Sequence, residues 1–272
     1  MVNHAKKGLA YELDFISYNN NNKSLSNPIW NFLISDLNLN ISINNLYLIK
    51  TSNAYSKLHK CLINSKSDTY IGVGSIPFDI LKNLNFIIDE DTAKNYNLKK
   101  LEFSGISIKK PDSKNYQILK ISPTPFFNLF ENYDIDPLSL GAGASLYCKK
   151  ESELSKNFPL IRGWGSNLNS FKIYFNHIDN ISLIDDPNTS DEIKLKIFKS
   201  IKNFSTSKIK NIIVKNQSLL DAIFLGKGIF EEPYVAHYIF ENNIINKNIT
   251  KDFKITTGSG RSKGIYQLEF KP

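Results

Sequence analysis

The stretch 170–176, Ser-Phe-Lys-Ile-Tyr-Phe-Asn, alternates apolar and polar side chains with a period of two. Successive side chains leave opposite faces of a strand, so this pattern predicts a strand with one apolar and one polar face. Lys172 and Tyr174 share the polar face. In an open sheet that face meets water, whereas in a closed barrel covered by helices it lines a lumen.

Residues 8–18 show a similar pattern and predict a second strand near the start of the chain. Tyr11 and Phe15 fall on one face of this strand, and Glu12 and Asp14 fall on the other. Each of the two predicted strands therefore has one mainly apolar face and one polar face.

Turn residues divide the middle of the chain into further elements. Extended arms at 101–109 and 116–122 flank Pro111-Asp-Ser and predict a hairpin. Either Lys109 or Lys110 is expected to reach inward near this turn. Residues 138–148 contain Gly-Ala-Gly-Ala without a Walker lysine or GxGxxG spacing, and they predict a strand where two backbones approach closely.

The second half of the chain contains the clearest helix signal. Thr189-Ser-Asp-Glu192 is a capping box, and the apolar residues after it recur at three- and four-residue steps. Alternation over 233–241 and over the pair 253–257 and 264–270 predicts further strands. About ten strands and five or six helices without an intervening linker predict one α+β domain over 1–272, a closed antiparallel barrel surrounded by helices.

Composition adds limits to this picture. The 272 residues are 41% hydrophobic and include only two cysteines outside any metal-ligand spacing, so we expect an ample core and no zinc site. The chain has no apolar run long enough to span a membrane and does not begin like a signal peptide, so we expect a cytoplasmic protein without a membrane partner. We also expect a monomer. The net charge of +8 comes from lysines spread through the whole chain, which makes nucleic acid an unlikely partner.

The segment 163–175, with its Gly-initiated turn and Lys172-x-Tyr174 strand, resembles the aromatic prenyltransferases with the ABBA barrel. The early stretch Tyr11-Glu-Leu-Asp-Phe15 is similar to the first strand of that family. The stretch 219–240, with Glu-Pro between two apolar arms, is similar to a late hairpin of its peptide-modifying cyanobactin branch. The resemblance implies a transferase that moves a dimethylallyl or geranyl group from its diphosphate to an aromatic small molecule or a peptide side chain.

This resemblance also implies roles for particular residues. Ionising an allylic diphosphate requires cationic donors at the leaving group and aromatic walls around the carbocation. Glu12 or Asp14 would orient or deprotonate the acceptor, and Asp14 would hold Mg²⁺, the expected cofactor. The other implied residues comprise the diphosphate ligands Lys109, Lys172, Tyr174 and Tyr238 and the cation-shielding residues Tyr234 and Tyr266.

Two other classes of function fit the same sequence. A basic module could hold single-stranded nucleic acid on an exposed Tyr and Lys face, and its binding would weaken steeply with salt. An accessory protein without catalysis is the second alternative, because the chain contains no high-specificity catalytic motif.

Overall fold

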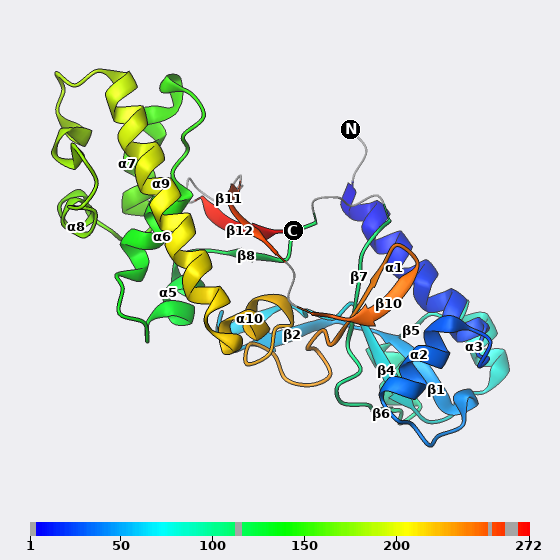
Figure 1. Cartoon of the computed structure of the whole chain (residues 1–272). Coiled ribbons are helices and arrows are strands. Elements are labelled where there is room, and N and C mark those ends of the chain that lie inside the picture. The colour runs from blue at the N-terminus through cyan, green and yellow to red at the C-terminus, as the bar shows by residue number, and fades with distance from the viewer. Residues whose placement is uncertain (1–3, 112–115, 250–251, 259–265) are drawn as a thin grey trace. The chain divides into compact units, whose positions relative to one another are not determined.

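The chain forms two compact units, seen here in a computed structural model that describes residues 4–111, 116–249, 252–258 and 266–272 (Figure 1). Unit 1 consists of residues 1–114 and 221–250, and unit 2 consists of residues 115–220 and 251–272. Because each unit is made of two segments that alternate along the chain, no single linker-like stretch separates the units in sequence. Each unit is described by itself below.

Unit 1 is built on a seven-stranded mixed sheet with the strand order β10-β9-β7-β4-β1-β5, and β6 also pairs with β4. The pairs β1–β5 and β7–β9 are parallel, and the other pairs are antiparallel. A separate hairpin is formed by β2 and β3. The strands are β1 (Leu46–Lys50), β2 (Asn53–Ser56), β3 (Cys61–Asn64), β4 (Thr69–Val73), β5 (Ile88–Asp89), β6 (Lys99–Lys100), β7 (Ile106–Ile108), β9 (Tyr238–Glu241) and β10 (Ile244–Lys247).

Helices cover both faces of this sheet. On one face α1 (His4–Asn21) and α2 (Pro28–Asp36) pack buried residues such as Ile16 and Trp30 against Leu48 and Ile71. The other face is covered by α3 (Phe78–Asn83) and α4 (Glu90–Asn95), and its core contains Ile49, Tyr70, Ile76, Leu81 and Ala93. The alternation of β1 decides this division, because consecutive side chains of the strand leave opposite faces.

Two buried asparagines hold α1 in place, Asn20 against the sheet and Asn19 against α2. The Asn20 side chain donates to the Leu48 and Phe86 carbonyls at 2.9 and 3.0 Å and accepts from the Leu48 N–H at 2.8 Å. The Asn19 carbonyl accepts from the Trp30 indole at 2.8 Å. Asn20 thus completes the hydrogen bonding of β1 at the point where the two-residue strand β5 does not reach.

Unit 2 combines five helices with the three-stranded antiparallel sheet β11-β12-β8. Its strands are β8 (Leu119–Ile121), β11 (Lys254–Gly258) and β12 (Gln267–Lys271). Its helices are α5 (Pro123–Phe130), α6 (Pro137–Ser145), α7 (Asn157–Gly163), α8 (Leu168–Tyr174) and α9 (Asp191–Val214), with 3₁₀ turns η2 (Glu151–Lys156) and η3 (Ile181–Asp185), and η1 (Ile43–Asn45) lies in unit 1. The boundary between the units falls inside α10 (Gln217–Phe224).

The centre of unit 2 is α6, which is buried along almost its whole length. A Cβ at Gly141 would overlap the Trp164 ring, and a Cβ at Gly143 would overlap Ser205 and Phe175. The predicted approach of two backbones is therefore wrong, because side chains rather than backbone atoms pack against these glycines. The element is a helix rather than a strand, because Asp136 caps it and Pro137 occupies its first turn.

The predicted fold class α+β is confirmed, but the predicted closed barrel is wrong. Within the described residues none of the three sheets closes on itself. Asp112 and Ser113 of the predicted turn lie outside the described residues, and the described arms of that hairpin do not pair, because β7 belongs to the mixed sheet and β8 to the small sheet of unit 2. The pair β11–β12 and the capped helix α9, which begins after Ser190, are as predicted.

The two strands on which the predicted site depended are helices. In α8, Phe171 and Phe175 are fully buried with their ring centroids 4.6 Å apart, whereas Ile173 is 72% exposed. Residues four apart share one face of a helix, so an alternation of period two can conceal a helical pair. The same ambiguity applies to Tyr11 and Phe15 in α1, which pack on the mixed sheet.

We predict that Asn20→Ala lowers the free energy of unfolding by about 2–4 kcal/mol, because it leaves the buried Leu48 N–H and two carbonyl groups without this partner. Urea denaturation measures the effect. The matched control is Asn22→Ala, which removes one exposed hydrogen bond within α1 and should cost less than about 1 kcal/mol. Equal losses in the two variants would contradict the role of Asn20.

Candidate functional site

Polar and charged residues of unit 1 gather at one end of the mixed sheet. At this end β1 and β5 finish, because Lys50 is paired with Thr69 and with Asp89. Thr69 is the first residue of β4 and is paired with Ile106, the first residue of β7, so β7 runs on beyond the start of β4. Segments that are far apart in sequence therefore place their side chains next to one another. They form two groups.

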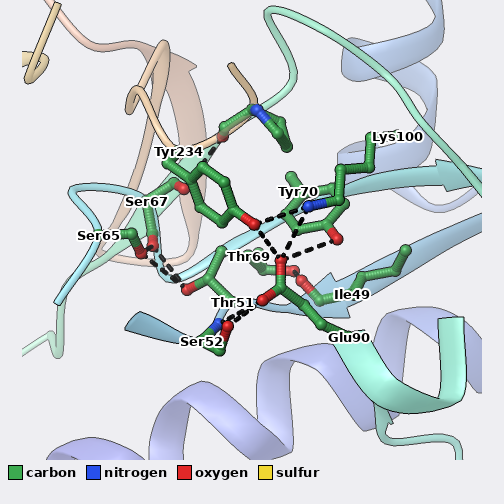
Figure 2. A network of polar contacts seen from close by, with 11 residues as sticks. Ile49, Thr51, Ser52, Ser65, Ser67, Thr69, Tyr70, Glu90, Lys100 and Tyr234 are labelled. Carbon is green, nitrogen blue, oxygen red and sulfur yellow. Dashed lines mark hydrogen bonds and ion pairs between the residues drawn. The ribbon is translucent and has the colours of Figure 1, made fainter. Parts of the chain in front are cut away.

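The first group, the Glu90 network, consists of Ser52, Tyr70, Glu90, Lys100 and Tyr234 (Figure 2). The Tyr70 and Tyr234 hydroxyls donate to Oε1 of Glu90 at 3.1 and 2.7 Å. The other carboxylate oxygen accepts from the Ser52 N–H at 3.3 Å and from its hydroxyl. Lys100 donates to the Tyr234 hydroxyl at 2.6 Å and lies 3.4 Å from Oε1 of Glu90.

These contacts fix the charges of the network. Partial burial alone would raise the pKa of Glu90. The hydrogen bonds from Ser52 and Tyr234 and the charge of Lys100 outweigh this effect and hold the pKa below its usual value. Burial likewise opposes the charge on Lys100, but its bonds to Tyr234 and Glu90 keep its pKa above the ordinary value. The network is thus a permanent ion pair joined through a tyrosine hydroxyl, with the lysine side chain 48% exposed and the glutamate 17% exposed.

Hydroxyl groups beside the network hold the loop that carries Tyr234. The Ser67 hydroxyl donates to the Pro233 carbonyl at 3.1 Å, and the Ser67 and Lys66 N–H groups donate to the Tyr234 carbonyl at 3.1 and 3.2 Å. The Thr51 hydroxyl donates to the Ser67 carbonyl at 2.7 Å (Figure 2). These bonds position Tyr234 over Tyr70, with the two rings at 75° and their centroids 6.2 Å apart.

The second group, the Glu12 cluster, consists of Glu12, Lys50, Lys66, Asp68 and Lys109. Glu12 comes from α1, Lys50 ends β1 and Asp68 precedes β4. Asp68 accepts from the Ile108 N–H at 2.6 Å and from the Ser107 hydroxyl at 3.2 Å, so its carboxylate is held at the end of β7, next to Lys109. Since Ile49 faces Tyr70, the neighbouring Lys50 faces α1.

Burial and mutual charge shift two groups of this cluster toward neutrality. Desolvation and the nearby Asp68 raise the pKa of Glu12 from 4.5 to about 7, against the opposing charges of Lys109 and Lys50. Desolvation and the charge of Lys109 lower the pKa of Lys66 from 10.5 to about 7, against the opposing charge of Asp68. Both side chains therefore exchange protons near neutral pH, which is typical of residues that transfer protons or bind charged ligands.

Two residues predicted from the sequence, Glu12 and Lys109, meet in the Glu12 cluster. Asp14 does not, because it is exposed on α1 and lies two residues from Glu12, on another side of the helix. Among the described residues, no group of three or more His, Cys, Asp or Glu side chains could hold a metal ion. The exposed position of Asp14 therefore does not suit its predicted role as a Mg²⁺ ligand, and the reaction proposed below does not involve this ion.

The two other predicted residues of unit 1 are tied to carboxylates. Tyr234 belongs to the Glu90 network, and the Lys100 ammonium lies 4.7 Å from the centroid of its ring. The ring predicted to shield a substrate carbocation thus already lies beside a cationic side chain of the protein. Tyr238 donates to Asp36 at 2.8 Å, and Asp36 forms an ion pair with Lys247 at 3.0 Å.

The remaining predicted residues belong to unit 2. Lys172 forms an ion pair with Asp185. Burial raises the pKa of Tyr174 to about 12, and its buried hydroxyl has no hydrogen-bond partner among the described residues. The Tyr266 carbonyl accepts from the Trp164 indole at 3.0 Å. The predicted diphosphate ligands therefore do not all belong to one compact unit.

Sequence reasoning missed most of the residues at the sheet end, including Lys50, Lys66, Asp68, Glu90 and Lys100. All but Lys66 directly precede, end or follow a strand, which is the signal that could have drawn attention to them. Their convergence depends on strand order and register, and these are not specified by local patterning.

No protein-family model matches this chain, and no curated protein matches its sequence. In the part of the chain that the structure describes, no helix combines the length and apolar character needed to cross a bilayer. We therefore infer the function from the geometry and electrostatics of the sheet end.

We predict that Glu12→Gln stabilises the protein above neutral pH. The raised pKa of Glu12 means that ionisation favours the unfolded chain, so wild-type stability falls between pH 4.5 and about 7 relative to the variant. We expect little difference at pH 4.5 and a gain of roughly 1–2 kcal/mol at pH 8, after allowance for solvent screening. Urea denaturation at both pH values measures it.

The control is Asp14→Asn, which neutralises an exposed carboxylate on the same helix and should give no such pH-dependent gain. A difference between Glu12→Gln and wild type that stays constant from pH 4.5 to pH 8 would contradict the shifted ionisation of Glu12.

Proposed function

We propose that unit 1 binds a phosphate or diphosphate ester at the Glu12 cluster, and that the chain is a transferase in which Glu12 accepts a proton from the acceptor. The observation that carries this proposal is the convergence of Lys50, Lys66 and Lys109 with Glu12 at the end of one sheet. Three ammonium groups around two carboxylates give a net positive site that favours a dianionic or trianionic ligand.

The lysines supply the affinity of the proposed site. Lys66 and Lys109 repel each other when both are charged, which contributes to the lowered pKa of Lys66. A bound phosphate group would neutralise this repulsion and accept hydrogen bonds from the ammonium groups. Part of the binding free energy would therefore come from relief of an unfavourable interaction that exists in the free protein.

Glu12 supplies the proton acceptor. A carboxylate with a pKa of about 7 is a stronger base than an ordinary glutamate and is still substantially ionised at neutral pH. In the proposed reaction the bond between carbon and the diphosphate oxygen breaks and diphosphate leaves with the electron pair. A bond from the acceptor to that carbon forms, and the acceptor's proton passes to Glu12.

An isoprenoid diphosphate is the member of this ligand class that the sequence resemblance suggests, with an aromatic or peptide acceptor. Lys172, Tyr174 and Tyr266 have no part in the proposed site, because they belong to unit 2. Tyr234 is a weak candidate for shielding a carbocation, since one face of its ring already lies near the ammonium of Lys100.

We predict that geranyl thiolodiphosphate and inorganic pyrophosphate both raise the melting temperature, since each binds the folded state selectively. Lys109→Ala should weaken the binding of both about 10-fold, the effect of one lost charge-assisted contact. The control is Lys82→Ala, an exposed lysine on α3 that should leave binding unchanged. Melting is measured for each variant with and without Mg²⁺.

Equal binding by wild type and Lys109→Ala would place the anion elsewhere and overturn the proposed site. The absence of any shift with either analogue, together with binding of single-stranded oligonucleotide that weakens steeply with salt, would instead support the nucleic-acid module.

A further inference from the structure

A pocket of about 390 Å³ lies within unit 2 between α7, the start of α8, η3 and α9. Phe158 and Ile161 of α7 and Leu168 of α8 form its apolar wall, and Arg162, Asp185 and Lys194 are its charged residues. The volume lies in the lower part of the range found for small-molecule pockets.

Two residues of the apolar wall pack into the interior of unit 2. Ile161 is almost fully buried, and the Phe158 ring packs edge-on against Phe198 of α9 with the centroids 5.8 Å apart. Asn167, at the pocket's edge, caps α8 by accepting from the Ser170 N–H at 2.8 Å. These contacts fix the two helices that line the pocket, so the apolar wall exists without a ligand.

The charges at the pocket are unbalanced. Asp185 is already neutralised by its ion pair with Lys172 of α8. Arg162 and Lys194 make no ion pair with any residue that the structure describes. Two cationic groups from different helices therefore remain beside an apolar wall, an arrangement that suits a ligand with an apolar body and a negatively charged head.

We propose that this pocket binds an amphiphilic carboxylate, with the apolar body against Phe158, Ile161 and Leu168 and the carboxylate held by Arg162 and Lys194. The planar guanidinium of Arg162 can donate two parallel hydrogen bonds to a carboxylate, and Lys194 adds a second charge. A chain of about ten carbons suits a pocket of this size. The proposal concerns unit 2 alone and is independent of the function proposed for unit 1.

The proposal is tested with decanoate, decanol and acetate as probes, and methyl NMR resonances of Ile161 and Leu168 report the site. We expect decanoate to shift both resonances saturably. Decanol, which lacks the charge, should bind at least about 10-fold more weakly, and acetate, which lacks the apolar body, should not bind in the same concentration range.

Arg162→Ala should weaken decanoate about 10-fold and leave the affinity for decanol unchanged, since it removes the charge contact alone. Lys194→Ala should act in the same direction, and it provides an independent variant if the first is unstable. Lys199→Ala removes an exposed lysine of α9 that does not line the pocket and should have no effect. Equal affinities for decanoate and decanol, or no shift at Ile161 and Leu168, would overturn the proposal.

Discussion

The arrangement of segments at the end of the mixed sheet in unit 1 depends on one partly buried carboxylate, that of Glu90, which requires hydrogen-bond donors from the protein. An ionised carboxylate removed from water is costly unless donors replace its hydration. Here the donors come from the segment after β1, from β4, from β6 and from the loop before β9. Satisfying this single group therefore holds together four segments that are distant in sequence, and it fixes the end of the sheet at which the Glu12 cluster also lies.

Two glutamates near this end of the sheet are shifted in opposite directions. Glu90 is surrounded by donors and stays charged, whereas Glu12 is desolvated beside Asp68 and has a pKa of about 7. Such a separation is the pattern expected when one carboxylate has a structural role and another exchanges protons. The hydrogen-bonded network around Glu90 supports the strand ends from which the Glu12 cluster is built.

The sequence predicted Glu12 and Lys109 as neighbours in one site, as the structure places them, but indicated the wrong secondary structure for both. Glu12 was expected on a strand and lies on α1, and Lys109 was expected in a hairpin and follows β7 of an open sheet. Capping residues gave a reliable prediction of α9, because capping is a local interaction. The helix α8 was mistaken for a strand, because a buried pair four residues apart also satisfies a period of two. The Glu90 network could not be predicted, since it depends on strand order and register.

In the proposed site an anion binds among groups that are partly neutral near pH 7. Isothermal titration calorimetry of pyrophosphate, performed at pH 7 in buffers of different ionisation enthalpy, measures the protons that binding takes up. A bound anion raises the pKa of Lys66, so this ammonium group takes up protons on binding. We expect net proton uptake in the wild type and a smaller uptake in Lys66→Met. Binding without proton uptake, or uptake unchanged in Lys66→Met, would overturn the proposed anion site.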